Sequence, residues 1–208
     1  MWTAFFIAQL ALAADTTAEP GDATSTVVVP DRAEYQRLSE EMEKLVAKNA
    51  WMGVEKAYVQ LVATGVSPSF ADHVSGAHAA RALGDVLATR NRLIAANTQR
   101  EDRAVLDWLY EIDSNYNRVF LACDPSTRSI DPAAMPFDPN QKRSVELAQV
   151  AISDAGLFDG YLPAGEYQFG DMKIKVEPRV QSVSIDVRTE EWMRELERRE
   201  KKEEKKNK

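Results

Sequence analysis

Residues 70–97 read FADHVSGAHAARALGDVLATRNRLIAAN, an alanine-rich stretch that favours helix on both sides of a single break. The break is the dipeptide Gly84-Asp85. Aspartate is a preferred N-cap, because its side-chain oxygen accepts a hydrogen bond from the first turn of a helix. We therefore predict two helices joined by a tight turn, with Asp85 as the N-cap of the second.

Amphipathic patterns on either side of this pair extend the helical region. Apolar residues recur at helical spacing in three further segments: Tyr35, Leu38, Met42 and Leu45; Trp51, Val54, Tyr58 and Leu61; and Val105, Trp108, Leu109 and Ile112 within residues 101–112. Lys48-Asn49 separates the first two segments, and Gly65 with Ser67-Pro68 ends the second. These patterns predict an antiparallel array of four or five helices over residues 33–112.

Part of this array resembles a known repeat family. Residues 69–102 look like one degenerate tetratricopeptide repeat, a helix–turn–helix unit of about 34 residues. The residues that carry the resemblance are Gly76, Gly84-Asp85, Ala88 and Ala95, which let two helices approach closely. Arg92 and Arg100 depart from the family pattern, which usually has an aromatic residue at the first position and often proline at the second. Trp51, Glu55 and Tyr58 resemble the first helix of a preceding repeat.

A looser resemblance covers most of residues 45–178. The segments that carry it are NAWMGVEKAY, AARALGDVLATRNRL, MPFDP and FDGYLPAGEYQFG. Together they are similar to uncharacterised exported bacterial proteins that pair repeat-like helices with a C-terminal α+β segment. This resemblance implies a fold and a location outside the cytoplasm, but no particular activity.

Residues 113–188 show a mixed pattern that predicts an α+β segment. In order, we expect a turn at residues 113–117, a strand at 118–123, a loop at 124–139, a helix at 141–155, a hairpin around Gly170-Asp171 and a strand through Val183, Ile185 and Val187. The expected fold class is thus α+β and mostly helical, with a TPR-like helix array followed by a small antiparallel sheet and one packed helix. We expect this segment to cap the array, because so few repeats cannot bury their faces alone.

The two ends of the chain have distinctive compositions, apolar at the N-terminus and highly charged at the C-terminus. Residues 1–14, within MWTAFFIAQLALAAD, have the apolar stretch and small-residue cleavage site of a signal peptide, although they contain no Lys or Arg. Residues 15–32 are expected to be a flexible spacer, so the mature protein is expected to be periplasmic or secreted. Residues 189–208 predict a charged helical tail with the i,i+4 pairs Glu190–Arg194, Glu195–Arg199 and Glu197–Lys201.

The composition disfavours several classes of partner. The net charge of −7 disfavours generic binding to nucleic acids and to anionic membrane surfaces. After the signal, no apolar run reaches the roughly 18 residues of a membrane span. The single cysteine, Cys123, follows an apolar run and is expected to be buried rather than reactive.

Candidate metal and catalytic residues are few. His73 and His78 are five residues apart on one predicted helix, whereas metal-binding pairs on helices are spaced three or four apart, so we expect no metal site. Asp113, Asn115, Asn117 and Asp124 echo a calcium loop, but Arg118 stands where such a loop needs glycine. We therefore interpret residues 113–117 as a turn. No catalytic or cofactor-binding motif is present, and Asp72, His73 and Ser75 are too close in sequence to form a triad.

Export, repeat-like helices and the lack of a catalytic motif favour one function. We expect a non-enzymatic scaffold of the bacterial envelope that binds a protein or peptide partner in the helical groove, without a cofactor. Its candidate binding residues are Tyr58, Arg81 and Arg92, although Trp51, Tyr58 and Trp108 fall at positions typical of packing. The alternative is an envelope hydrolase that uses His73 or His78 with scattered carboxylates.

Overall fold

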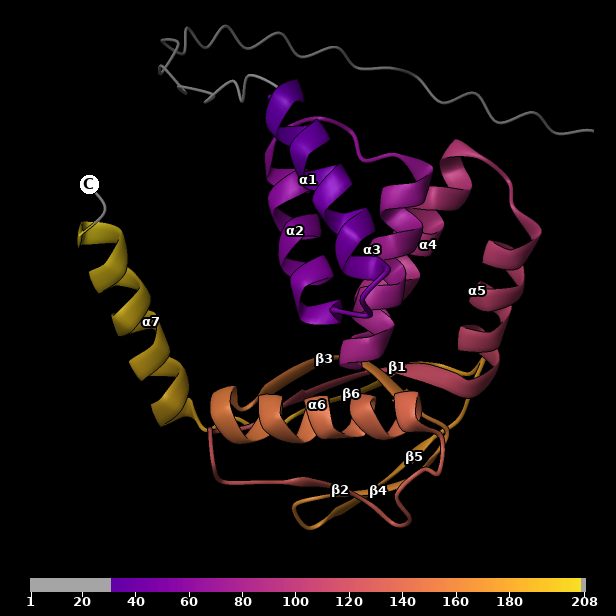
Figure 1. Ribbon diagram of the computed structural model, residues 1–208. Helices are drawn as coiled ribbons and strands as arrows, with labels where there is room; N and C mark the ends of the chain where they lie inside the picture. The colour runs from indigo at the N-terminus through magenta and orange to yellow at the C-terminus, as the bar shows by residue number, and fades with distance from the viewer. Residues whose placement is uncertain (1–30, 207–208) are drawn as a thin grey trace, which may run out of the picture.

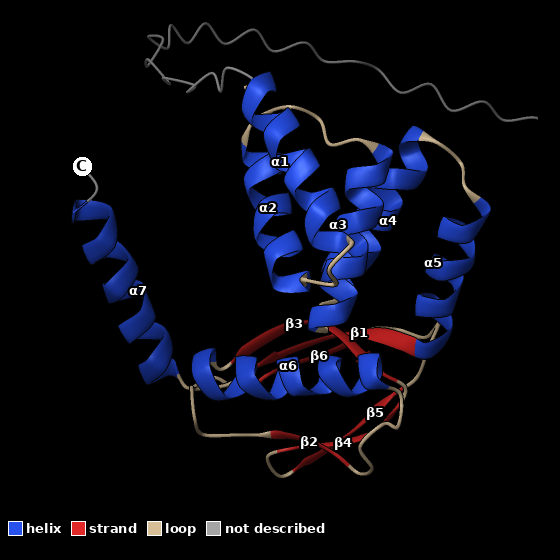
Figure 2. Cartoon of the chain, viewed as in Figure 1, coloured by secondary structure: helices blue, strands red, loops and turns tan. Residues whose placement is uncertain are grey.

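The structure, a computed structural model, describes residues 31–206 (Figure 1). The predicted signal peptide and most of the predicted spacer lie outside these residues. Five helices come first, namely α1 (Arg32–Val46), α2 (Trp51–Ala63), α3 (Phe70–Leu83), α4 (Val86–Gln99) and α5 (Arg103–Asn115). The remaining elements are β1 (Tyr116–Ala122), β2 (Ile130–Pro132), α6 (Pro139–Ala155), β3 (Leu157–Pro163), β4 (Gly165–Phe169), β5 (Met172–Val176), β6 (Val183–Asp186) and α7 (Glu190–Lys206). The described chain is α+β and mostly helical, as predicted (Figure 2).

The predicted turn between α3 and α4 is confirmed. Gly84 ends α3 in the left-handed region with φ +87°, a conformation that glycine adopts without steric penalty. The Asp85 side chain accepts a hydrogen bond from the Ala88 N–H and so caps α4. At the other end of α3, Ser69 and Asp72 form a reciprocal capping box. Short-range chemistry therefore sets both ends of this helix.

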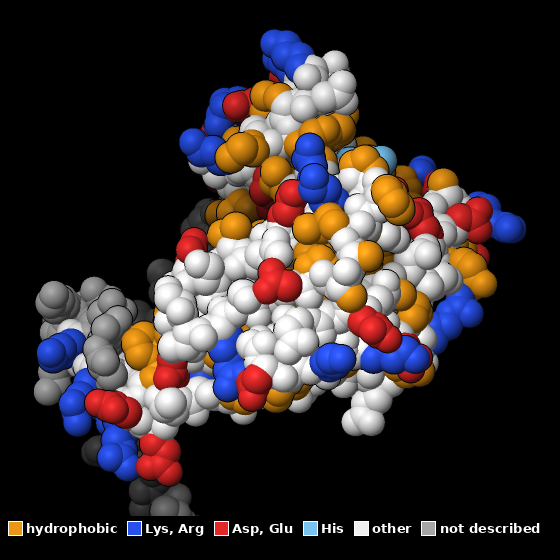
Figure 3. Space-filling model, turned by 90° about the horizontal axis from the view of Figure 1, so that it is seen from below, with side chains coloured by type: hydrophobic (Ala, Val, Ile, Leu, Met, Phe, Trp, Pro, Cys, Tyr) orange, Lys and Arg blue, Asp and Glu red, His pale blue; other side chains and the backbone are white. Residues whose placement is uncertain are grey.

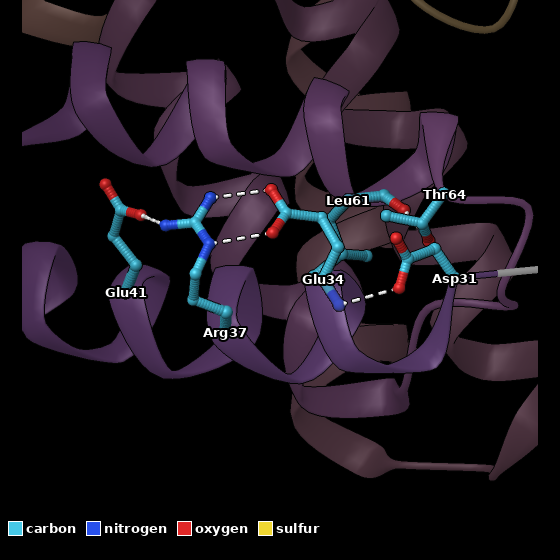
Figure 4. Close-up of polar contacts among 6 residues, drawn as sticks. All are labelled: Asp31, Glu34, Arg37, Glu41, Leu61 and Thr64. Atoms are coloured by element: carbon cyan, nitrogen blue, oxygen red, sulfur yellow. Dashed lines mark hydrogen bonds and ion pairs between the residues drawn. The ribbon is translucent and has the colours of Figure 1, made fainter.

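The first two helices are tied together at one end. Asp31 caps α1 by accepting a hydrogen bond from the Glu34 N–H, and its own N–H donates to the Thr64 carbonyl just after α2 (Figure 4). Arg37 bridges the carboxylates of Glu34 and Glu41 along the exposed side of α1. Both ion pairs lie within α1, so they do not connect it to α2, and the backbone hydrogen bond from Asp31 to Thr64 makes this connection.

The strands form two sheets, where one small antiparallel sheet was predicted. One sheet has the order β3-β1-β6 and the other β2-β4-β5. The pairing of β1 with β6 is parallel, with Val119 opposite Val183. A parallel pair requires a long connection, and here the connection contains α6 and the four strands β2, β3, β4 and β5. The predicted hairpin is confirmed, since β4 and β5 pair across Gly170, which has φ +59°.

Two predictions for the region around β1 and β2 are wrong. Residues 113–117 do not form a turn, because α5 continues to Asn115 and β1 begins at the next residue. The Ser114 hydroxyl and the Asn115 amide donate to carbonyls of the same helix, so these turn-forming side chains support the helix instead. Residues 124–139 are not simply a loop, because they contain β2 and the start of α6, where Pro139 follows the N-cap Asp138.

Helix α6 connects the two halves of the structure. It packs against β2 and β3, and it also contacts α3 (Figure 1). Its buried residues Val145, Ala148 and Ile152 form one core with residues of both sheets. Two other cores lie among the helices, one between α1, α2 and α3 and one between α3, α4 and α5. Tyr116, the first residue of β1, belongs to the latter core and so joins the halves.

The tail forms a helix, as predicted. Thr189 precedes α7 and is held by Asp124, which accepts hydrogen bonds from its N–H and its hydroxyl. Two of the predicted ion pairs are present, Glu190–Arg194 and Glu197–Lys201. The helix extends away from the rest of the chain (Figure 1). Seen from below, the body of the molecule carries acidic and basic side chains side by side (Figure 3).

The contact between Gly84 and α6 generates a stability prediction. A Cβ atom at residue 84 would lie 2.5 Å from the carbonyl oxygen of Arg143, and the residue would keep a left-handed φ. We predict that Gly84→Ala lowers the free energy of unfolding by about 2–4 kcal/mol, because neither strain nor backbone clash can relax locally. Urea denaturation followed by circular dichroism measures the change.

Gly165→Ala is the matched control. A Cβ atom there would lie 3.6 Å from its nearest neighbour, a carbon of the Tyr167 ring, which is an ordinary contact. This variant should change the free energy of unfolding by less than about 1 kcal/mol. Equal effects of the two substitutions would show that the Gly84 contact does not hold the halves together.

Candidate binding face

The helical half presents one exposed group of aromatic and charged side chains. His78 on α3 lies between two tryptophans, with 6.3 Å between the ring centres of Trp51 and His78 and 4.7 Å between those of His78 and Trp108. The guanidinium of Arg81 lies 5.1 Å from the centre of the Trp108 ring and forms an ion pair of 2.6 Å with Glu111. We call these five residues the aromatic face.

Helical spacing explains how the face is assembled. His78 and Arg81 are three residues apart on α3, and Trp108 and Glu111 are three apart on α5, so each pair lies on one side of its helix. Trp51, the first residue of α2, completes the group. His78 is exposed and both tryptophans are half-buried, so the face combines fixed rings with an accessible centre.

The electrostatics of the face favour a neutral histidine. Although His78 is exposed at the surface, the atoms packed around its ring desolvate it and lower its pKa, and the nearby Arg81 cation lowers it further. At neutral pH the imidazole is therefore uncharged. The ion pair of Arg81 and Glu111 balances the remaining charges, and its partial exposure makes its contribution small. The aromatic face is thus close to electrically neutral.

Tyr58 and Arg92, two of the three predicted binding residues, have internal contacts instead. The Arg92 guanidinium binds both carboxylate oxygens of Glu55, at 2.5 and 2.6 Å, and donates to the Gly76 carbonyl at 2.7 Å. It also lies 4.1 Å from the centre of the Tyr58 ring. Tyr58 is buried, as its packing position predicted, and its ring leaves no room for a Cβ at Gly76. This group connects α2, α3 and α4.

The structure separates the two histidines. His73 is buried, and its Nδ1 is 2.8 Å from the Tyr58 hydroxyl oxygen, so its hydrogen bond is internal. His78 is exposed on the aromatic face. Burial lowers the pKa of His73, although the neighbouring carboxylate of Asp72 partly offsets this. Within residues 31–206, no group of three His, Cys, Asp or Glu side chains is arranged to hold a metal ion.

Asp72 is the centre of a separate polar network. Its carboxylate accepts hydrogen bonds from the hydroxyls of Tyr35 at 2.6 Å, Ser39 at 2.7 Å and Ser69 at 2.6 Å. Burial alone raises the pKa of Asp72, but these hydrogen bonds together outweigh burial and keep the pKa below its ordinary value. The network joins α1 to the start of α3, and it gives Asp72 partners other than a histidine.

The remaining candidate residues are buried or make contacts within the fold. Cys123 is buried at the end of β1, as predicted, and burial raises the pKa of its thiol. Asp113 of the calcium-like pattern pairs with Arg90 at 2.9 Å, and the Asn117 amide binds backbone carbonyls. In the part of the chain that the structure describes, no helix has both the length and the apolar character needed to cross a membrane.

Comparison with known families, with curated proteins and with solved structures found no match to this chain. Sequence reasoning selected Arg81 but missed the pairing of Trp51, His78 and Trp108, which come from three helices. The spacing of His78 with Arg81 and of Trp108 with Glu111 was visible in the sequence, but it does not show that α3 and α5 bring the pairs together.

The Asp72 network leads to a prediction about pH. Since the folded pKa is depressed below 3.8, the unfolded chain takes up the proton first as pH falls. The stabilisation by Asp72 is complete above the unfolded pKa and is lost as pH falls through the folded pKa. We predict that Asp72→Asn lowers the free energy of unfolding at pH 7 by about 1–3 kcal/mol, because the amide accepts fewer hydrogen bonds. The difference from wild type should shrink below pH 3.8.

Urea unfolding of both proteins between pH 7 and pH 3 measures this difference. Asp107→Asn is the control, because Asp107 is exposed and, in the part of the chain that the structure describes, forms its ion pair with Arg103 of its own helix. That control should change stability by less than about 0.5 kcal/mol. A loss in the Asp72 variant that stays constant at every pH would contradict the role of its charge.

Proposed function

We propose that this chain is a non-enzymatic protein of the bacterial envelope that binds a protein or peptide partner through its aromatic face. The observation that carries the proposal is the exposed His78 ring between Trp51 and Trp108, with Arg81 over the second tryptophan. Tryptophan and arginine are the residue types that most often dominate binding energy at protein interfaces. A half-buried ring also loses little freedom when a partner binds.

The fixed surroundings of the face support this function. Arg81 is oriented by Glu111 and by the Trp108 ring, so its position is set before a partner arrives. Since the face is near neutral, the partner that fits it presents apolar or aromatic side chains rather than a run of charge. Of the predicted binding residues, we assign only Arg81 to binding, because Tyr58 and Arg92 have internal partners.

We further propose that the helical array is a short relative of tetratricopeptide-repeat arrays. Support comes from the tight α3–α4 turn at Gly84 and from Gly76, which lets the α2 ring of Tyr58 lie against α3. In such arrays, each unit buries its face on a neighbour. Here α6 and the sheets supply part of that neighbouring surface, since the α3–α4 turn rests on α6.

The hydrolase alternative receives no support from the contacts of the histidines. His73 bonds Tyr58, and the adjacent Asp72 bonds hydroxyl groups of α1 and Ser69. The cavities of about 480, 430 and 210 Å³ are lined by neither histidine. General acid–base chemistry needs a histidine within reach of a substrate and an orienting partner.

Export of the protein has a direct test. Residues 1–14 have signal-peptide composition, with small residues at the expected cleavage site. We predict that the protein recovered from the envelope or the medium begins at Ala14 or Asp15, as measured by N-terminal sequencing. A mature protein that retains residues 1–14 in the cytosolic fraction would contradict export.

The binding face can be tested by site-specific cross-linking in the native host. A photo-reactive phenylalanine analogue at position 78 should give a discrete adduct with the partner, because this position is the centre of the face. The same analogue at Glu40, which is exposed on the side of α1 opposite the buried Leu38 and Met42, is the control and should give none. Trp108→Leu in the position-78 protein should reduce the adduct at least tenfold, since loss of an interface tryptophan costs about 2 kcal/mol.

Three results would count against the aromatic face. They are the same adducts from both positions, no adduct from position 78, and an adduct that persists unchanged with Trp108→Leu. Circular dichroism of the Trp108→Leu protein must show that it remains folded, so that a lost adduct reflects the surface and not the fold.

A further inference from the structure

A second candidate site lies where the helical half meets the first sheet. It is an open cleft of about 430 Å³ between α4, α5, β1, β3 and the segment between β5 and β6. The residues that line it are Arg90, Tyr110, Asp113, Tyr116, Asn117, Tyr161 and Arg179. Two guanidinium groups and three phenol rings thus share one cleft. A cleft with aromatic walls and a few polar groups is typical of a small-molecule site.

Arg179 lies in the loop between β5 and β6, which hydrogen bonds hold in one conformation. It is a non-glycine residue with φ +60°, a conformation that L residues rarely adopt. The side-chain amide of the buried Asn117 donates to the carbonyls of Glu177, Val180 and Gln181, at 2.8, 3.4 and 3.2 Å. These three hydrogen bonds fix the loop backbone around the Asn117 side chain. The loop therefore presents Arg179 to the cleft in a defined position.

The charge of Arg179 is not neutralised by the protein. Its Nη2 donates to the Ser114 hydroxyl at 2.6 Å, and its guanidinium lies 4.6 Å from the centre of the Tyr110 ring. Among residues 31–206 it forms no ion pair with a carboxylate, whereas Arg90 is paired with Asp113. The lining therefore carries two positive charges and one negative charge, in a chain whose net charge is −7.

We propose that this cleft binds a small organic carboxylate with an apolar or aromatic body. A guanidinium fork matches a planar carboxylate, and Arg179 has N–H groups left after its bond to Ser114. The rings of Tyr110 and Tyr161 offer surfaces for the body of the ligand. Since Asp113 is also in the lining, a singly charged carboxylate is favoured over a doubly charged phosphate.

The cleft is separate from the aromatic face. Tyr110 and Asp113 each lie two residues from Trp108 and Glu111 on α5, which places them about 200° apart around the helix. The two sites thus use opposite sides of α5, and the carboxylate site does not depend on the proposed partner. The ligand could be a free acid or the C-terminal residue of a peptide, which share this chemistry.

The test uses N-acetylphenylalanine as the probe, with the purified protein, isothermal titration calorimetry and amide NMR shifts. The free acid should bind and shift the resonances of residues 177–181. N-acetylphenylalanine amide, which lacks the charge, should bind at least tenfold more weakly, and so should inorganic phosphate. A peptide with a free C-terminal phenylalanine that binds more tightly than the acid indicates a peptide terminus, and the reverse order indicates a free acid.

Two variants separate binding from folding. Arg179→Asn removes the guanidinium but keeps a residue that tolerates positive φ, so binding should weaken at least tenfold with an unchanged melting temperature. Asp113→Asn removes the repelling charge and frees Arg90, so binding should become at least threefold tighter. Damage to the fold cannot produce such a gain. Arg37→Gln, which removes a positive charge on the exposed side of α1, is the control and should leave binding unchanged.

The proposal is overturned by any of four results. The first is no binding of the free acid at about 10 mM, a concentration at which even a weak site with a millimolar Kd would be mostly occupied. The others are equal binding of acid and amide, tighter binding of phosphate than of the acid, and equal binding by wild type and Arg179→Asn. None of these results bears on the aromatic face, so failure here is distinguishable from failure of the proposed partner binding.

Discussion

The close packing of α3 between its neighbours is the constraint on which the rest of the structure depends. Gly76, Ala77, Ala79 and Ala80 are buried, so backbones can approach where larger side chains would hold them apart. Small side chains bury little apolar area, which limits the hydrophobic stabilisation of this contact. The polar groups around α3 compensate: Asp72 joins it to α1, and Arg92 joins its Gly76 carbonyl to α2. Arg92 and Tyr58, two of the three binding candidates from the sequence, therefore help to hold the helices together.

The end of α3 then determines where the second half lies. Gly84 rests on the backbone of α6 at Arg143, and the Arg143 side chain donates to the Ala82 carbonyl. Because the Gly84 contact joins backbone to backbone, side-chain rotamers do not set the distance between α3 and α6 at this point. Helix α6 in turn carries the core shared by both sheets. The contact at Gly84 thus fixes how the helical half lies relative to the strands.

The features that could be predicted from sequence are those with local causes. The Gly84-Asp85 turn, the break at Lys48-Asn49 and the Gly170 hairpin each follow from a few neighbouring residues, and the structure contains all three. Strand β3 and the parallel pairing of β6 with β1 were missed, because their partners are distant in sequence and FDGYLP lacks a clean alternation. The same limit applies to the sites. The sequence indicated Arg81, but not that α2, α3 and α5 would bring two tryptophans to His78.

Helix α5 explains why both candidate sites occur where they do. It leaves the array and passes directly into β1, with Asn115 followed at once by Tyr116, so its orientation is set from both ends (Figure 1). Its buried residues Val105 and Ile112 face the array, while Tyr110 is exposed. A helix that is anchored along one side and at both ends leaves two flanks free. One flank supplies Trp108 to the aromatic face, and the other supplies Tyr110 to the cleft. A rigid element with two accessible flanks can serve two separate ligands, because occupation of one flank does not require movement of the other.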